Sequence, residues 1–78
     1  MDRADYEWHY YIGGNCALKR RKYGGAIANI VHIEQGVYEA SFFRDGDVYK
    51  TWSLGIYQDS NEAQKALEKA LQPLWEKP

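Results

Sequence analysis

This chain of 78 residues lacks several features that small proteins use for stability or chemistry. A single cysteine, Cys16, excludes an intramolecular disulfide, and together with His9 and His32 it matches no zinc-binding spacing. No apolar run approaches the roughly 18 residues of a membrane span, and the acidic first residues do not resemble a signal peptide. We therefore expect no cofactor, no metal and no membrane partner. A cytoplasmic location is also expected, because a lone free thiol suits a reducing compartment.

Catalytic signatures are also missing. No nucleophile, base and orienting acid stand out together, and the glycine pairs are of the turn type and do not form a phosphate-cradling loop. Asp45 and Asp47 resemble the start of a calcium loop, but the remaining ligands are absent, so we interpret them as turn residues. A domain of this size encloses little of a pocket. We predict that the protein is not an enzyme.

Charge is nearly balanced overall but clustered locally. The net charge is −1, whereas the basic run Lys19–Lys22 places four bases at consecutive positions. A duplex-DNA module is usually clearly basic throughout, which argues against duplex DNA as the main partner. The basic run has two interpretations: a solvated strand end that protects a sheet edge, or a contact with phosphates or an acidic protein surface. Tyr10, Tyr11 and Tyr23 could stack on bases beside it or pack in a core or interface.

Alternating apolar residues and turn signals predict strands, and one helical pattern follows them. The predicted strands cover residues 6–12, 16–22, 26–33, 37–43 and 48–54. The predicted helix covers 60–72, begins after the capping residue Asp59 and ends before Pro73. Its apolar stripe consists of Ala63, Ala66, Leu67, Ala70 and Leu71. We therefore predict a single α+β domain over residues 1–78, an antiparallel sheet of four or five strands (about 6–54) covered on one face by a C-terminal helix.

The segment from 36 to 71 resembles the AP2-type module, a three-stranded sheet covered by one helix. The resemblance lies in Tyr38-Glu39-Ala40-Ser41-Phe42, Leu54-Gly55-Ile56-Tyr57, Glu62-Ala63, Ala66 and Ala70. Similar sheets occur in phage integrase arm-binding and homing endonuclease domains, and the family reads DNA from its open sheet face. That function does not carry over by residue, because the face away from the helix would show no basic side chain, only Ile27, Val31, Ile33, Val37, Glu39, Ser41 and Phe43. Arg44 and Lys50 are the only bases predicted near it.

The apolar residues predicted on this face are either covered by the N-terminal strands or form a contact patch. We favour a small non-enzymatic protein-binding module, derived from phage or a mobile element. It would inhibit or modulate a nucleic-acid-handling protein in the style of anti-defence or anti-CRISPR proteins. The alternative is a direct DNA- or RNA-binding regulator that uses the basic run. The partner would be a protein, alone or within a nucleoprotein complex, and the thin core also allows a homodimer. The candidate contact residues are Lys19, Arg20, Arg21, Lys22, Tyr23, Val31, Ile33, Val37, Phe43, Arg44 and Lys50.

Overall fold

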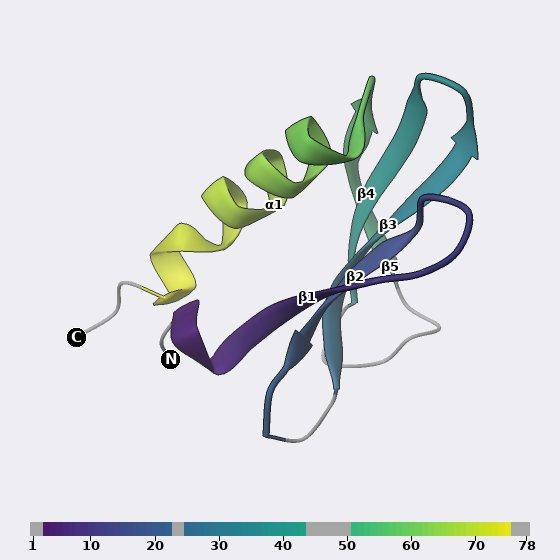
Figure 1. Ribbon diagram of the computed structural model, residues 1–78. Helices are drawn as coiled ribbons and strands as arrows, with labels where there is room; N and C mark the ends of the chain where they lie inside the picture. Colours follow the sequence, from purple (N-terminus) through teal and green to yellow (C-terminus); the bar gives the residue numbers. More distant parts are fainter. Residues whose placement is uncertain (1–2, 23–24, 44–50, 76–78) are drawn as a thin grey trace.

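The strands form one antiparallel meander with a single long helix across one of its faces (Figure 1). The computed structural model describes residues 3–22, 25–43 and 51–75. Its elements are, in chain order, the 3-10 turn η1 (Arg3–Asp5), β1 (Tyr6–Tyr10), β2 (Cys16–Arg20), β3 (Ala26–Glu34), β4 (Val37–Phe43), β5 (Thr51–Tyr57) and α1 (Ser60–Trp75). Each strand pairs with the next, in the order β1-β2-β3-β4-β5. The predicted α+β class with a C-terminal helix on one face is confirmed.

The N-terminal strands extend the sheet and do not wrap over it. β1 pairs with β2, and β2 pairs with β3, so all five strands lie in one layer. The sheet face opposite α1 is called the open face below. Because β1 and β2 add to the edge of the sheet, they do not cover the open face of β3, β4 and β5. The coverage by the N-terminal strands that the sequence left open is therefore not what the structure shows.

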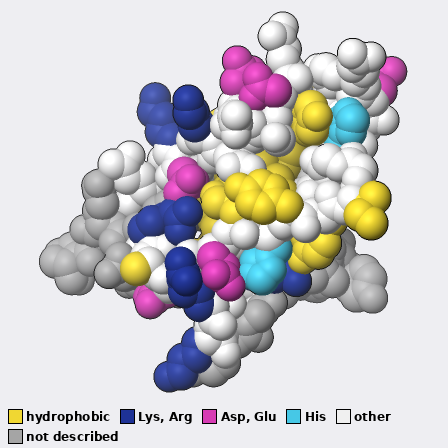
Figure 2. All heavy atoms as spheres, viewed as in Figure 1, with side chains coloured by type: hydrophobic (Ala, Val, Ile, Leu, Met, Phe, Trp, Pro, Cys, Tyr) yellow, Lys and Arg dark blue, Asp and Glu magenta, His cyan; other side chains and the backbone are white. Residues whose placement is uncertain are grey.

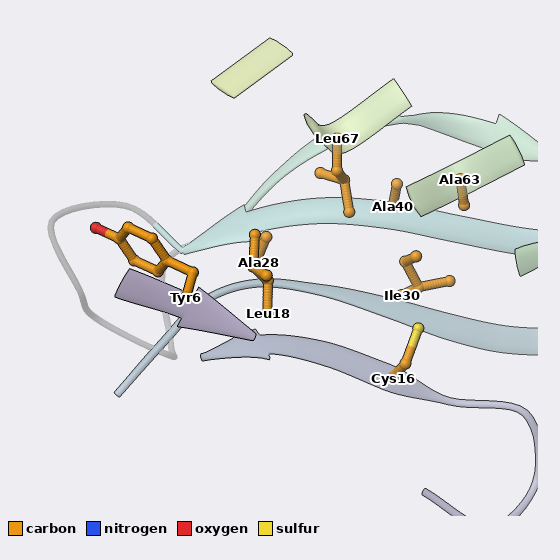
Figure 3. Close-up of a cluster of buried hydrophobic side chains, with 8 residues drawn as sticks. All are labelled: Tyr6, Cys16, Leu18, Ala28, Ile30, Ala40, Ala63 and Leu67. Atoms are coloured by element: carbon orange, nitrogen blue, oxygen red, sulfur yellow. The ribbon is translucent and has the colours of Figure 1, made fainter. Parts of the chain in front are cut away.

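The core lies between α1 and the middle of the sheet. Ala63 and Leu67 are fully buried, and Leu71 packs against the same cluster. They share one buried cluster with residues of β2, β3 and β4 (Figure 3), among them Leu18, Ala28, Ile30 and Ala40. Alanines on both layers let the helix backbone approach the sheet closely, which close packing of a thin core requires.

The buried stripe of α1 is narrower than predicted. Ala66 is only half-buried and Ala70 is exposed, whereas Ala63, Leu67 and Leu71 repeat at i, i+4 and i+8. One straight helix on one sheet presents a single narrow line of contact, so the two flanking alanines face partly or wholly toward solvent.

The two ends of α1 were predicted with different success. Asp59 caps the first turn as expected, because its Oδ1 accepts the Glu62 backbone N–H at 2.8 Å. The prediction of the C-terminal end was wrong, because the helix continues through Pro73 to Trp75 instead of ending near residue 72. Pro73 removes only its own N–H in the last turn, so the helix loses one hydrogen bond and is not broken. No helix in the described ranges is long and apolar enough to span a membrane.

The last strand differs from its predicted range of 48–54. Residues 48–50 lie outside the described part, and β5 continues through Gly55 to Tyr57. Ser41 of β4 faces Ser53 and Ala40 faces Gly55, so Leu54 is an extra residue, a β-bulge. Gly55 adopts φ of +153°, which favours glycine and explains why the chain can continue as a strand there.

Polar contacts attach the N-terminal segment to the flank of α1 that faces β1 and β2. Glu68 accepts hydrogen bonds from Arg3 Nε and from Trp8 Nε1, the latter at 3.4 Å. Gln64, one turn earlier, donates to Cys16 Sγ at 3.6 Å. β1 and β2 are therefore bound to the helix by side chains, although α1 packs mainly on β3, β4 and β5.

Candidate functional site

Exposed apolar side chains gather on the open face where β3, β4 and β5 meet. Val31 of β3 lies opposite Glu39 of β4, and Glu39 lies opposite Ile56 of β5, so the three share one row across the sheet. Residues directly opposite in antiparallel strands lie on the same face, with Cβ atoms about 5 Å apart. Ile33 follows Val31 on the same side of β3. The exposed fractions are 41% for Val31, 56% for Ile33 and 55% for Ile56, and these three residues are called the open-face patch.

The remaining predicted members of this surface are less accessible. Val37 and Phe43 are half-buried at the two ends of β4. Ile27, which was expected on the exposed face, is half-buried and packs against the buried core cluster. The pairing of β2 with β3 shifts register between Leu18 and Lys19, and Ile27 is the extra residue at this shift. The structure therefore brings Val31 and Ile33 together at the surface and keeps Val37 and Phe43 at its margins.

Small and polar residues form the row next to the open-face patch. Ala17, Asn29, Ser41 and Ser53 lie opposite one another on β2, β3, β4 and β5, and Ala17 and Ser41 are buried despite facing away from the helix. The Ser53 hydroxyl donates to Glu39 Oε2 at 2.9 Å. This bond holds the Glu39 carboxylate in place between Val31 and Ile56. The open-face patch thus surrounds one positioned acceptor.

Charged groups of both signs occupy the open face on β1 and β2. Glu7 accepts from two sides: His9 Nε2 lies 3.1 Å from its Oε1, and Arg21 Nη1 lies 3.3 Å from its Oε2. Lys19, directly opposite Glu7, places its Nζ 5.4 Å from the centre of the Tyr11 ring. These are partly exposed pairs, so each adds little stability, but together they bring charges of both signs to one part of the open face.

The basic run does not form one surface. Lys19 faces Glu7 on the open face, whereas Arg20 lies opposite the buried Tyr6 and therefore on the helix side. Arg21 is paired with Glu7, and Lys22 is exposed in the turn that follows. Alternation along β2 separates neighbours that the sequence places together. Figure 2 shows bases and acids interspersed over the viewed side, with hydrophobic atoms between them.

Tyr23, Arg44 and Lys50 lie outside the described residues.

The β1–β2 hairpin loop is held against β3 by polar contacts. The His32 backbone N–H donates to Asn15 Oδ1 at 2.8 Å, and His32 Nδ1 lies 2.8 Å from the Gly13 carbonyl oxygen. A carbonyl only accepts, so Nδ1 carries the hydrogen. The His32 ring also stacks on Tyr38, with ring centroids 4.4 Å apart. His32 therefore has a structural role, and the loop presents Ile12 fully exposed at its tip.

Cys16, His9 and His32 do not form a common site. Cys16 is buried under α1, His9 faces Glu7, and His32 supports the hairpin loop. Burial raises the pKa of the Cys16 thiol above its ordinary range, with an opposing contribution from the Gln64 hydrogen bond, so the thiol is a poor nucleophile. No group of three or more His, Cys, Asp or Glu residues in the described part could hold a metal ion.

Comparison with known proteins adds no assignment: no family model, no curated protein and no solved structure matches this chain. Three exposed apolar residues of the described part, Ile12, Trp52 and Ile56, are not among the contact residues predicted from the sequence. Ile56 was missed because the last strand was expected to end at Leu54. The available signal was Gly55, since a glycine inside a strand pattern often marks a bulge beyond which the strand continues.

Proposed function

We propose that this protein is a non-enzymatic protein-binding module whose contact surface is the open face of its sheet. The observation that carries the proposal is the exposure of Val31, Ile33 and Ile56 around Glu39 on the side opposite α1. Apolar side chains gathered on a rigid surface favour contact with another protein, because burying them removes apolar area from water.

The charged residues on β1 and β2 support the same proposal. The group formed by Glu7, His9, Lys19 and Arg21 flanks the apolar region with bases and an acid in mutual contact. An apolar centre with a polar, mixed-charge rim is the usual anatomy of a protein interface. Such rim charges mainly set the rate and orientation of encounter rather than the strength of the final complex.

The class of partner is proposed from the sequence resemblance. The AP2-type pattern over residues 36–71 favours a nucleic-acid-handling protein as the target, alone or within a nucleoprotein complex. In this proposal the chain inhibits or modulates that target, as a product of phage or a mobile element. Its free thiol, Cys16, favours action in the reducing cytoplasm.

Direct binding to DNA or RNA is the second candidate, favoured by the exposure of Arg20 and Arg21. Affinity for a phosphate backbone depends on several bases directed at it from one surface. Lys19 and Arg20 face opposite sides of the sheet, and Arg21 is engaged by Glu7. This separation makes nucleic acid the weaker candidate.

Site-specific photocrosslinking in cells of the native host tests the proposal. A benzoylphenylalanine introduced at Ile33 should capture a defined protein, because this position lies within the open-face patch. The same group introduced at Lys65, which is exposed on the outer side of α1, should give no adduct of that mass. Val31→Lys should abolish the adduct from position 33, whereas Ile12→Lys, the same change at the hairpin tip, should leave it intact.

Gel shifts with duplex and single-stranded DNA and RNA form the second arm. A salt-sensitive shift that Arg20→Glu and Arg21→Glu abolish, with no protein adduct from position 33, would overturn protein binding and favour direct nucleic-acid binding. Equal adducts from positions 33 and 65 would also contradict the proposal, since the open face would then have no special role.

A further inference from the structure

The two edge strands of the sheet differ in charge. β1 carries Glu7 and His9, and Glu7 is further paired with Arg21. β5 has no charged residue and no proline in its seven positions, yet it is the last strand of the sheet in the order observed. Natural proteins protect sheet edges with charges, prolines or bulges, because an unprotected edge pairs with another strand. Of these three devices β5 has only the bulge at Leu54. β5 is therefore the edge suited to accept a further strand.

The bulge at Leu54 determines how a second β5 can pair with the first. The register with β4 and the packing of the core place Ser53 and Ile56 on the open face, and Trp52, Leu54, Gly55 and Tyr57 on the helix side. Counted outward from the midpoint between Leu54 and Gly55, the side chains lie on the helix side, the open face and the helix side again, and this order is the same in both directions along β5. An antiparallel pair related by a two-fold axis at this midpoint therefore keeps facing side chains on the same side of the sheet.

This register gives compatible neighbours at each position. Ser53 would lie opposite the second copy's Ile56, Trp52 opposite its Tyr57, and Leu54 opposite its Gly55. Aromatic pairs across antiparallel strands are favourable, a leucine has room beside a glycine, and no like charges meet. The arrangement is closed by symmetry, because both β5 edges are used and only the charged β1 edges remain.

We propose that two copies of this chain pair through β5 to form one continuous sheet of two five-stranded halves. The pairing places Ile56 of both copies at the joint on the open face, so the two open-face patches become one larger surface. This inference does not depend on the partner proposed above. A monomeric protein could still bind a partner through its open face, and a dimer could bind none.

Mass measurement by light scattering and sedimentation equilibrium tests the pairing with the intact chain. The wild type should show twice the mass of one 9.1 kDa chain at about 0.5 mM, with dissociation on dilution. S53K/I56K places like charges opposite each other at both Ser53–Ile56 pairs and should weaken the dimer about tenfold or more. S53K/I56E places opposite charges at the same two pairs and should restore it. V31K, an equally drastic change at an exposed position away from the edge, should leave the dimer intact.

Hydrogen exchange provides a readout that needs no variant. In the wild type, amides of β5 should become more protected as concentration rises, whereas amides of β1 should not change. A wild type that stays monomeric at about 0.5 mM would overturn the pairing. So would a dimer that S53K/I56K leaves unchanged, or one that V31K dissociates, because the joint would then lie elsewhere.

Discussion

Ala63→Leu tests the contact between α1 and the sheet at its closest point. Ala63 is fully buried and points from the helix toward Ala40 and Ile30, both of which are also fully buried (Figure 3). A leucine at this position would add a branched group where the surrounding atoms already fill the space. The helix would have to lift from the sheet, or neighbouring side chains would have to leave their preferred rotamers.

The expected loss is about 1–3 kcal/mol of unfolding free energy, the usual cost of overpacking a filled core. For a domain of this length, each kcal/mol lowers the melting temperature by about 4–8 °C, so a decrease of roughly 5–20 °C is expected. Urea denaturation should show a lower midpoint with an unchanged slope. The control is Ala70→Leu, the same substitution at an exposed position of the same helix, which should change stability little. Equal effects of the two substitutions would refute the proposed line of contact.

Two further predictions concern a glycine and the buried thiol. Gly14→Ala should cost about 1–3 kcal/mol, because Gly14 has φ of +86° and an added Cβ would lie 3.0 Å from His32 Nδ1. Gly25→Ala, with nothing within 4 Å of the added Cβ, should be close to neutral, and equal losses in urea denaturation would contradict this reasoning. Cys16 should react with thiol reagents far more slowly in the folded than in the unfolded chain. Burial raises the pKa of the Cys16 thiol in the folded chain above its value in the unfolded chain. The contribution of this thiol to the free energy of unfolding is therefore fully present below the pKa of the unfolded chain. The unfolding free energy should therefore fall as pH rises past that value. C16A should lack this fall, and an identical pH profile would contradict the prediction.

Local patterns in the sequence were sufficient to predict the α+β class, with an antiparallel sheet and one C-terminal helix, but not every element boundary or the place of the N-terminal strands. Apolar periodicity located the strands and the helix, and the N-cap at Asp59 was predicted correctly because the cap depends only on residues three positions apart. The apolar stripe also indicated which side of α1 is buried. Its width was overestimated, with Ala70 exposed, because that width depends on the shape of the surface beneath the helix.

Features of the candidate site depended on the tertiary structure. The bulge at Leu54 arises from pairing with β4, and it places Ile56 on the open face, where sequence reasoning had expected the strand to have ended. Lys19 and Arg20 point to opposite faces because side chains alternate along any strand, and the pairing of β2 with β1 decides their neighbours, Glu7 for Lys19 and Tyr6 for Arg20. The sequence by itself determined which residues belong to the same strand or helix. Register between strands, which is set by contacts distant in sequence, decided which of them share a surface.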